Sequence, residues 1–130
     1  MLDQIIRSDP VLKKIILRGG ITMKQLDYLL TQKLSESNSK LLEKIMKTNN
    51  KPPSKASYII TRERGKSNIK QAMYTLIIAH YLGLVRADCF AGLEKTGFVL
   101  KESKDKELSV EQTTMVLLAL EALIDRLILV

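Results

Sequence analysis

The chain has 130 residues, of which 45% are hydrophobic and 27% charged, and this composition excludes wholesale disorder. The 21 basic and 14 acidic residues give a net charge of +7, and the single cysteine, Cys89, excludes an internal disulfide and favours a reducing compartment. Aromatic residues are scarce, at 5%, and no apolar stretch is long enough for a signal peptide or a membrane span. We therefore expect one cytoplasmic, all-α domain over residues 1–130, with a multi-helix core.

The first part of the chain carries several helix-start and helix-stop signals. Asp9-Pro10 is typical of an N-cap followed by the first helical position, and Gly19-Gly20 ends that helix. The T-x-x-Q pattern at 22–25 predicts a capping box and a second helix. A short helix is predicted over 39–48, and the two prolines within 49–53 predict a turn after it.

Two helices are predicted on either side of Gly65. Ser54 is a typical N-cap for a short helix over 54–64, which Gly65 would end. The segment 57–61 also suits a strand, because it contains Tyr, Ile and Thr. The inner stripe of the helix is predicted from an i, i+3, i+4 spacing of apolar residues: Ala56, Ile59 and Ile60.

The second half of the chain predicts three more helices. A helix over 67–82, with Gly83 as its stop, is expected to be central and mostly buried because apolar residues recur along it at helical spacing. A short helix is predicted from about 88 to 95, followed by an exposed loop over 101–107. A second capping box, S-x-x-Q at 109–112, opens a final helix that is apolar nearly all round.

The residues that usually carry catalysis are isolated in this sequence. His80 and Cys89 are the only histidine and cysteine, and neither has partners at the spacing of a metal site or of a nucleophile–base pair. The segment 62–67 ends in Gly-Lys-Ser, but Ile60 occupies the place of the first glycine of a phosphate-binding loop. We expect a protein that is not an enzyme and that holds no metal and no cofactor.

The positive charge is concentrated in one quarter of the chain. Residues 40–70 contain nine basic and two acidic residues, a net charge of +7, so the other 99 residues balance to zero. Lysines at i and i+4 often form a solvated helix face, and this remains an alternative. A strongly basic segment in an otherwise neutral chain, however, indicates a binding site for a polyanion.

The basic segment has the layout of a helix-turn-helix, with a helix over 39–48, a turn, and a second helix over 54–64. Such a unit places its second helix in the major groove of duplex DNA. The residues expected to read bases are Lys55, Ser57, Tyr58, Thr61 and Arg62. The residues expected to contact phosphates are Lys40, Lys44, Lys47, Lys51, Arg64, Lys66 and Lys70.

Two stretches, ITMKQLDYLLTQKL and LLEKIMKTNNKPPSKASYIITRERG, resemble the three-helix core of small helix-turn-helix regulators such as those of archaea and their plasmids and viruses. The resemblance covers about residues 20–85. It implies a sequence-specific transcriptional regulator that binds double-stranded DNA and is associated with the nucleoid. The turn departs from the family pattern, because Pro52-Pro53 replaces the usual small residue or glycine.

Two alternatives use other parts of the sequence or another class of partner. The segment 84–94 is similar to the recognition helix of winged-helix proteins, with wing strands at 98–101 and 107–110. The basic tip of that wing would be formed by Lys101, Lys104 and Lys106. The other alternative is a small helical subunit of a nucleoprotein assembly, which contacts protein or RNA instead of reading DNA bases.

The final helix also predicts an oligomer. A helix that is apolar on every face lies either in a large core or between subunits, and a chain of this length has little room for two such helices. We therefore expect a homodimer that pairs through residues 109–130. The expected interface stripe consists of Leu120, Leu123, Ile124 and Leu127.

Overall fold

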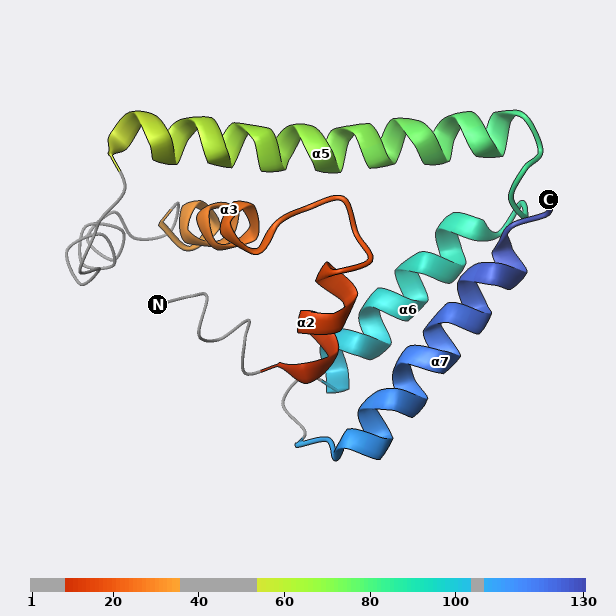
Figure 1. The fold of residues 1–130 in the computed structure, drawn as a ribbon. Helices are drawn as coiled ribbons and strands as arrows, with labels where there is room; N and C mark the ends of the chain where they lie inside the picture. The colour runs from red at the N-terminus through yellow and green to blue at the C-terminus, as the bar shows by residue number, and fades with distance from the viewer. Residues whose placement is uncertain (1–8, 36–53, 104–106) are drawn as a thin grey trace. The chain divides into compact units, whose positions relative to one another are not determined.

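The computed structural model describes residues 9–35, 54–103 and 107–130, and most of these are helical (Figure 1). The helices are α2 (Pro10–Ile16), α3 (Met23–Ser35), α5 (Lys55–Tyr81), α6 (Cys89–Ser103) and α7 (Val110–Leu127). The predicted all-α fold class is thus confirmed for the described ranges. The helix predicted over 39–48 and the turn over 49–53 lie outside these ranges. No helix among the described residues is both long enough and apolar enough to cross a membrane.

The helix starts predicted at Asp9, Thr22 and Ser109 are confirmed by their capping hydrogen bonds. The Asp9 carboxylate accepts hydrogen bonds from the backbone N–H groups of the first turn of α2, at 3.0 and 3.1 Å. Thr22 and Gln25 form a reciprocal capping box before α3, with bonds of 3.1 and 3.0 Å. Ser109 and Gln112 do the same before α7, at 3.1 and 2.9 Å. Each cap satisfies backbone donors that the helix itself leaves unpaired.

The chain forms two compact units, Met1–Ala72 and Met73–Val130. Helices α2 and α3 belong to the N-terminal unit, whereas α6 and α7 belong to the C-terminal unit. Helix α5 contributes its longer, N-terminal part to the first unit and its last nine residues to the second. The single domain expected over 1–130 stays a prediction.

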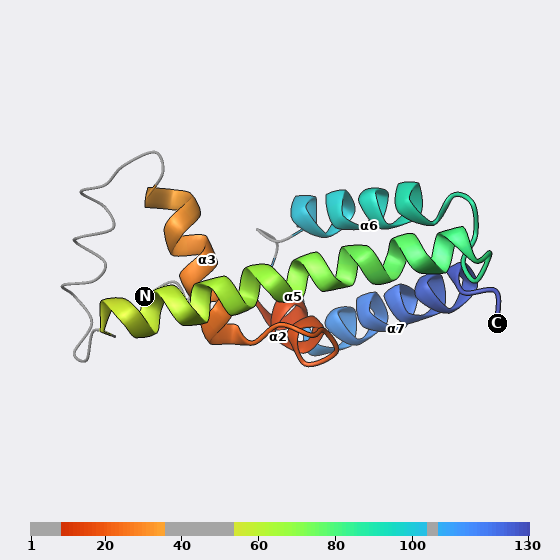
Figure 2. The same cartoon turned by 90° about the horizontal axis from the view of Figure 1, so that it is seen from above.

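Helix α5 is one continuous helix of 27 residues, so the predicted break at Gly65 is wrong (Figures 1 and 2). Gly65 is buried, and a Cβ at this position would lie 2.9 Å from Gln25 Cβ and 3.0 Å from Leu29 Cδ1. The residue is a glycine where the side chains of α3 approach the α5 backbone closely, and no helix end is involved. The Ser54 hydroxyl accepts a bond of 3.1 Å from the Ser57 N–H and caps α5 as predicted.

The buried side of α5 also differs from the prediction. Tyr58 and Gly65, two helical turns apart, are its buried residues, because α3 packs on this side. The predicted inner stripe, Ala56, Ile59 and Ile60, is exposed. The expectation of a mostly buried helix over 67–82 is also wrong, since Ile69, Met73 and Ile77 are exposed.

Helix α5 ends where the sequence predicted, at a glycine with left-handed backbone geometry. Gly83 has a φ of 71°, a conformation that residues with a Cβ rarely adopt. Its N–H donates to His80 O at 3.1 Å, and the Leu84 N–H donates to Ala79 O at 2.8 Å. This pair of bonds is a Schellman motif, which satisfies the last carbonyl groups of the helix.

Helices α6 and α7 pack antiparallel in the C-terminal unit (Figure 1). Leu127, at the end of α7, lies against Gly92 near the start of α6, where a Cβ would be 3.4 Å from Leu127 Cδ2. Cys89 and Leu117 are also buried in this unit. Residues 127–129, at the end of α7 and just after it, pair with residues 84–86. The Arg86 N–H donates to Leu127 O at 2.9 Å, and the Leu129 N–H donates to Leu84 O at 2.8 Å.

Helix α6 extends through Gly97, where the sequence predicted that a shorter helix would already have ended. The wing strand predicted over 98–101 is therefore wrong, because these residues are helical. The second predicted strand, 107–110, contains the N-cap and first residue of α7 instead. The tip residues Lys104 and Lys106 lie outside the described ranges.

Candidate nucleic-acid interface

The junction between α3 and α5 is built around two tyrosines. The rings of Tyr28 and Tyr58 lie with centroids 4.9 Å apart and planes inclined by 48°. The Tyr58 hydroxyl donates a hydrogen bond of 3.3 Å to the backbone carbonyl of Tyr28. Tyr58 is only 6% exposed, so its ring packs inside the N-terminal unit, away from solvent.

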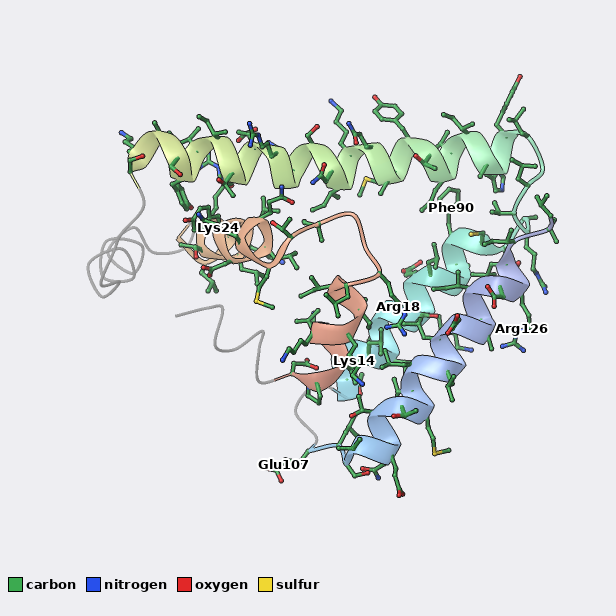
Figure 3. The ribbon with its side chains drawn as sticks, viewed as in Figure 1. Lys14, Arg18, Lys24, Phe90, Glu107 and Arg126 are labelled. Carbon is green, nitrogen blue, oxygen red and sulfur yellow. The ribbon has the colours of Figure 1, made fainter. Side chains whose placement is uncertain are left out.

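A basic side chain lies over each of the two tyrosine rings. Lys24 Nζ lies 5.9 Å from the centroid of the Tyr28 ring, and Arg62 Cζ lies 5.5 Å from that of Tyr58. These distances are in the range of cation–π contacts. The four side chains thus form a continuous chain of contacts from α3 (Lys24 is labelled in Figure 3) to α5. Arg62 also pairs with the exposed Glu63 at 3.3 Å.

Burial raises the pKa of the Tyr28 phenol above its ordinary value, and the neighbouring Asp27 carboxylate and Tyr58 add to this rise. The phenol is therefore held in its neutral form more strongly than a solvated tyrosine. In the same junction, the Arg62 Nε–H is buried and has no hydrogen-bond acceptor among the described residues. The guanidinium is thus held mainly by the Tyr58 ring and by Glu63.

Gln25 joins the cap of α3 to the side of α5. Its Oε1 atom accepts hydrogen bonds from the Thr22 N–H and from Asn68 Nδ2, both at 3.0 Å. The T-x-x-Q pattern predicted the first bond but gave no sign of the second, since Asn68 is 43 residues away. The contact fixes the α3 helix start against the middle of α5.

Basic residues form a line along α5. We call this line the α5 basic stripe, and it consists of Lys55, Arg62, Lys66 and Lys70. Ile59 lies between the first two, so that successive positions are four, three, four and four residues apart. This spacing keeps them on one side of a helix over about 22 Å. The three lysines are exposed, and the Arg62 side chain is 21% exposed. The stripe lies beside the face that contacts α3.

The structure does not bring the five predicted base-reading residues onto one surface. Lys55 is exposed, but Tyr58 is buried under the α3 contact. Ser57 and Thr61 are half-buried and lie on the side of the helix opposite Lys55. Arg62 is partly covered by its contacts with Tyr58 and Glu63.

The predicted phosphate contacts divide into three groups. Lys66 and Lys70 belong to the α5 basic stripe, whereas the exposed Arg64 lies on nearly the opposite side of the helix from Lys66. The other four, Lys40, Lys44, Lys47 and Lys51, lie outside the described residues. Lys24 was missed by the sequence reasoning, and its position four residues before Tyr28 was the one available signal.

The predicted dimer stripe on α7 is partly used inside the C-terminal unit. Leu127 is 6% exposed and packs on Gly92, because α6 covers this side of α7. Leu120 and Leu123 are half-buried, and Ile124 is 40% exposed. Of the four residues, Ile124 therefore offers the most surface to another molecule.

The two units carry opposite net charges. Residues 1–72 contain fifteen basic and six acidic residues, a net charge of +9, whereas residues 73–130 contain six basic and eight acidic residues, a net charge of −2. The basic stripe therefore belongs to a unit that is positive as a whole. A polyanion would be attracted to the N-terminal unit and weakly repelled by the C-terminal one.

The contacts that His80 and Cys89 make are packing contacts. Cys89 is buried, and the His80 ring lies 5.5 Å from the Phe90 ring, which Figure 3 labels at the start of α6. Within the described ranges, no group of three histidine, cysteine, aspartate or glutamate residues could hold a metal ion.

Comparisons with protein-family models, with curated proteins and with solved structures found no match for this chain.

Proposed function

We propose that this protein binds double-stranded DNA, without catalysis, through the α5 basic stripe. The observation that carries the proposal is the alignment of Lys55, Arg62, Lys66 and Lys70 along one side of a continuous helix, in a unit of net charge +9. An α-helix fits the major groove, and lysines along it reach the phosphates on the groove edges. Such binding would place the protein on the nucleoid of the cell.

The contacts are mainly to phosphates and only secondarily to bases. Tyr58 is buried, and Ser57 and Thr61 lie away from the stripe, so three of the residues expected to read bases are withdrawn from the proposed surface. The exposed lysines are flexible point charges, which suit phosphates better than the edges of one particular base. Any sequence preference, and hence any role as a specific regulator, would depend on Arg62.

Duplex DNA is favoured over single strands because the helix offers no exposed aromatic ring for base stacking between Lys55 and Lys70. Proteins that bind single strands combine basic grooves with such rings. The one tyrosine in the N-terminal half of α5, Tyr58, is occupied by Tyr28. A subunit that follows RNA in a nucleoprotein assembly is the second candidate, because the same line of charges could follow an RNA backbone.

Fluorescence anisotropy with labelled duplex DNA, single-stranded DNA and duplex RNA, at several salt concentrations, tests the proposal. Four phosphate contacts predict that log affinity for duplex DNA falls with log salt with a slope of about −4. Binding to single strands should be weaker at every salt concentration. Absence of binding to duplex DNA at low salt, or a slope near zero, would contradict the proposal, and tighter binding to duplex RNA would favour the second candidate.

A further inference from the structure

The end of α5 presents an apolar surface that the described part of the chain leaves exposed. Five residues form this surface, which we call the α5 apolar face: Met73, Tyr74, Ile77, Ile78 and Tyr81. Each is more than half exposed, and Tyr81 reaches 86%. The residues recur at i, i+1, i+4, i+5 and i+8, so they lie on one side of the helix. Residues 71–85 contain no lysine, arginine, aspartate or glutamate.

The opposite side of this stretch of α5 is the covered one. Leu76 and Ala79 are half-buried, three residues apart. The apolar face is therefore turned away from the packing within the described residues. A soluble monomer rarely leaves a continuous patch of this kind in water.

The area of the face is large enough for a stable dimer. Five side chains that each leave roughly 100–200 Å² in water give a patch on the order of 600 Å² per copy. Two such patches would bury about 1,200 Å² in total, which is the lower end of stable protein–protein interfaces. The face carries no charge, so two copies of it meet without repulsion and without leaving a charge buried.

We propose that the α5 apolar face pairs with the same face of a second copy, with the two α5 helices antiparallel. The orientation follows from charge. In a parallel pair the two basic stripes would lie side by side and repel each other, whereas an antiparallel pair places them at opposite ends of the assembly. The pairing depends on the exposed apolar residues and its orientation on the charges of the stripe, and neither depends on whether the stripe binds DNA.

The pairing replaces the α7 stripe as the expected dimer contact. Leu127 is already buried by α6, whereas Ile78 and Tyr81 have no comparable cover among the described residues. Sedimentation equilibrium of the full chain can therefore distinguish the two interfaces. The variants to compare are Ile78→Glu on the α5 face, Ile124→Glu on α7, and Met115→Glu as a control on an exposed apolar residue of α7.

We expect the wild type to be a dimer at micromolar concentration, and Ile78→Glu to weaken dimerisation at least 100-fold with unchanged helix content by circular dichroism. Ile124→Glu and Met115→Glu should remain dimeric. If Ile78→Glu does not fold, Tyr81→Ser takes its place, because that side chain is almost fully exposed. A monomeric wild type, including one that binds anionic lipid vesicles, would overturn the proposal, and so would dissociation by Ile124→Glu alone.

A spin label tests the antiparallel orientation. Ala56 is exposed near the start of α5, and the wild type measures any background from the buried Cys89. Residue 56 lies about 32 Å along the helix from the middle of the face, so labels on Ala56→Cys should be about 65 Å apart in the antiparallel dimer. A distance below about 25 Å would indicate a parallel pair and overturn the proposed arrangement.

Discussion

Gly65 and Gln25 meet at a point where there is no room for another carbon atom: a Cβ on Gly65 would lie 2.9 Å from Gln25 Cβ. The same glutamine bonds the start of α3 and the side chain of Asn68 on α5. The absence of a side chain at Gly65 thus allows α3 and α5 to approach closely, and this approach buries Tyr58 and leaves the stripe residues on the neighbouring side.

Gly65→Ala should destabilise the protein by about 1–3 kcal/mol, because the added methyl group forces α3 away from α5. The usual effect of this substitution inside a helix is the reverse, a gain of up to about 1 kcal/mol. Gly97→Ala is the matched control, since Gly97 lies in α6 and no other described residue comes within 4 Å of its Cβ position. Urea unfolding measures both, and a stabilised Gly65→Ala variant would show that the two helices do not pack as described.

Tyr58→Phe should lower the free energy of unfolding by about 1 kcal/mol, through loss of the bond to the Tyr28 carbonyl. Its affinity for duplex DNA should equal that of the wild type, because the hydroxyl is buried. Anisotropy at fixed salt measures the affinity. A clear loss of binding by a variant that is still folded would place Tyr58 at the DNA and would support the original helix-turn-helix interpretation.

Ser109→Ala should cost about 1 kcal/mol, because the α7 capping box loses the acceptor for the Gln112 N–H. Ser109→Asp should restore most of this loss, since aspartate is an equally good N-cap. Thermal unfolding followed by circular dichroism compares the three proteins. Equal stability of the alanine variant and the wild type would mean that the cap is not formed in solution.

Stability should fall at alkaline pH, and Tyr28 should account for part of the loss. The pKa of its phenol is raised in the folded state, mainly by burial. The corresponding stabilisation is fully present below the unfolded pKa of about 10 and is lost as the pH rises through the higher folded pKa. Urea unfolding between about pH 9 and 11 should show a shallower decline for Tyr28→Phe than for the wild type. Identical declines would exclude Tyr28 as a cause.

Local signals in the sequence predicted four of the helix ends correctly. Asp9, Thr22, Ser109 and Gly83 act within one helical turn of their partners, so their roles can be seen in a short window. Gly65 misled the prediction, because a glycine at a helix stop and one at a close helix contact look alike without the partner helix. The burial of Tyr58 depends on Tyr28, 30 residues away, which periodicity alone could not show.

The line of charges on α5 could be found from the sequence only in part. The spacing of Lys55, Arg62, Lys66 and Lys70 indicates one face as soon as the helix is known to continue past Gly65. The predicted break separated these residues into two helices and hid the stripe. The charge concentration itself was visible from composition, because it does not depend on the fold.

The salt dependence of DNA binding by two triple variants tests the central claim most directly. One variant removes three charges from the stripe (Lys55→Gln, Lys66→Gln and Lys70→Gln), and the other removes three exposed charges from the C-terminal unit (Lys95→Gln, Lys101→Gln and Arg126→Gln). Both have the same net charge, so only the position of the charges differs. We predict that the slope of log affinity against log salt becomes shallower by about 3 in the stripe variant and stays within about 1 of the wild type in the control. Equal changes in the two variants would contradict the account, because binding would then follow net charge and not the α5 basic stripe.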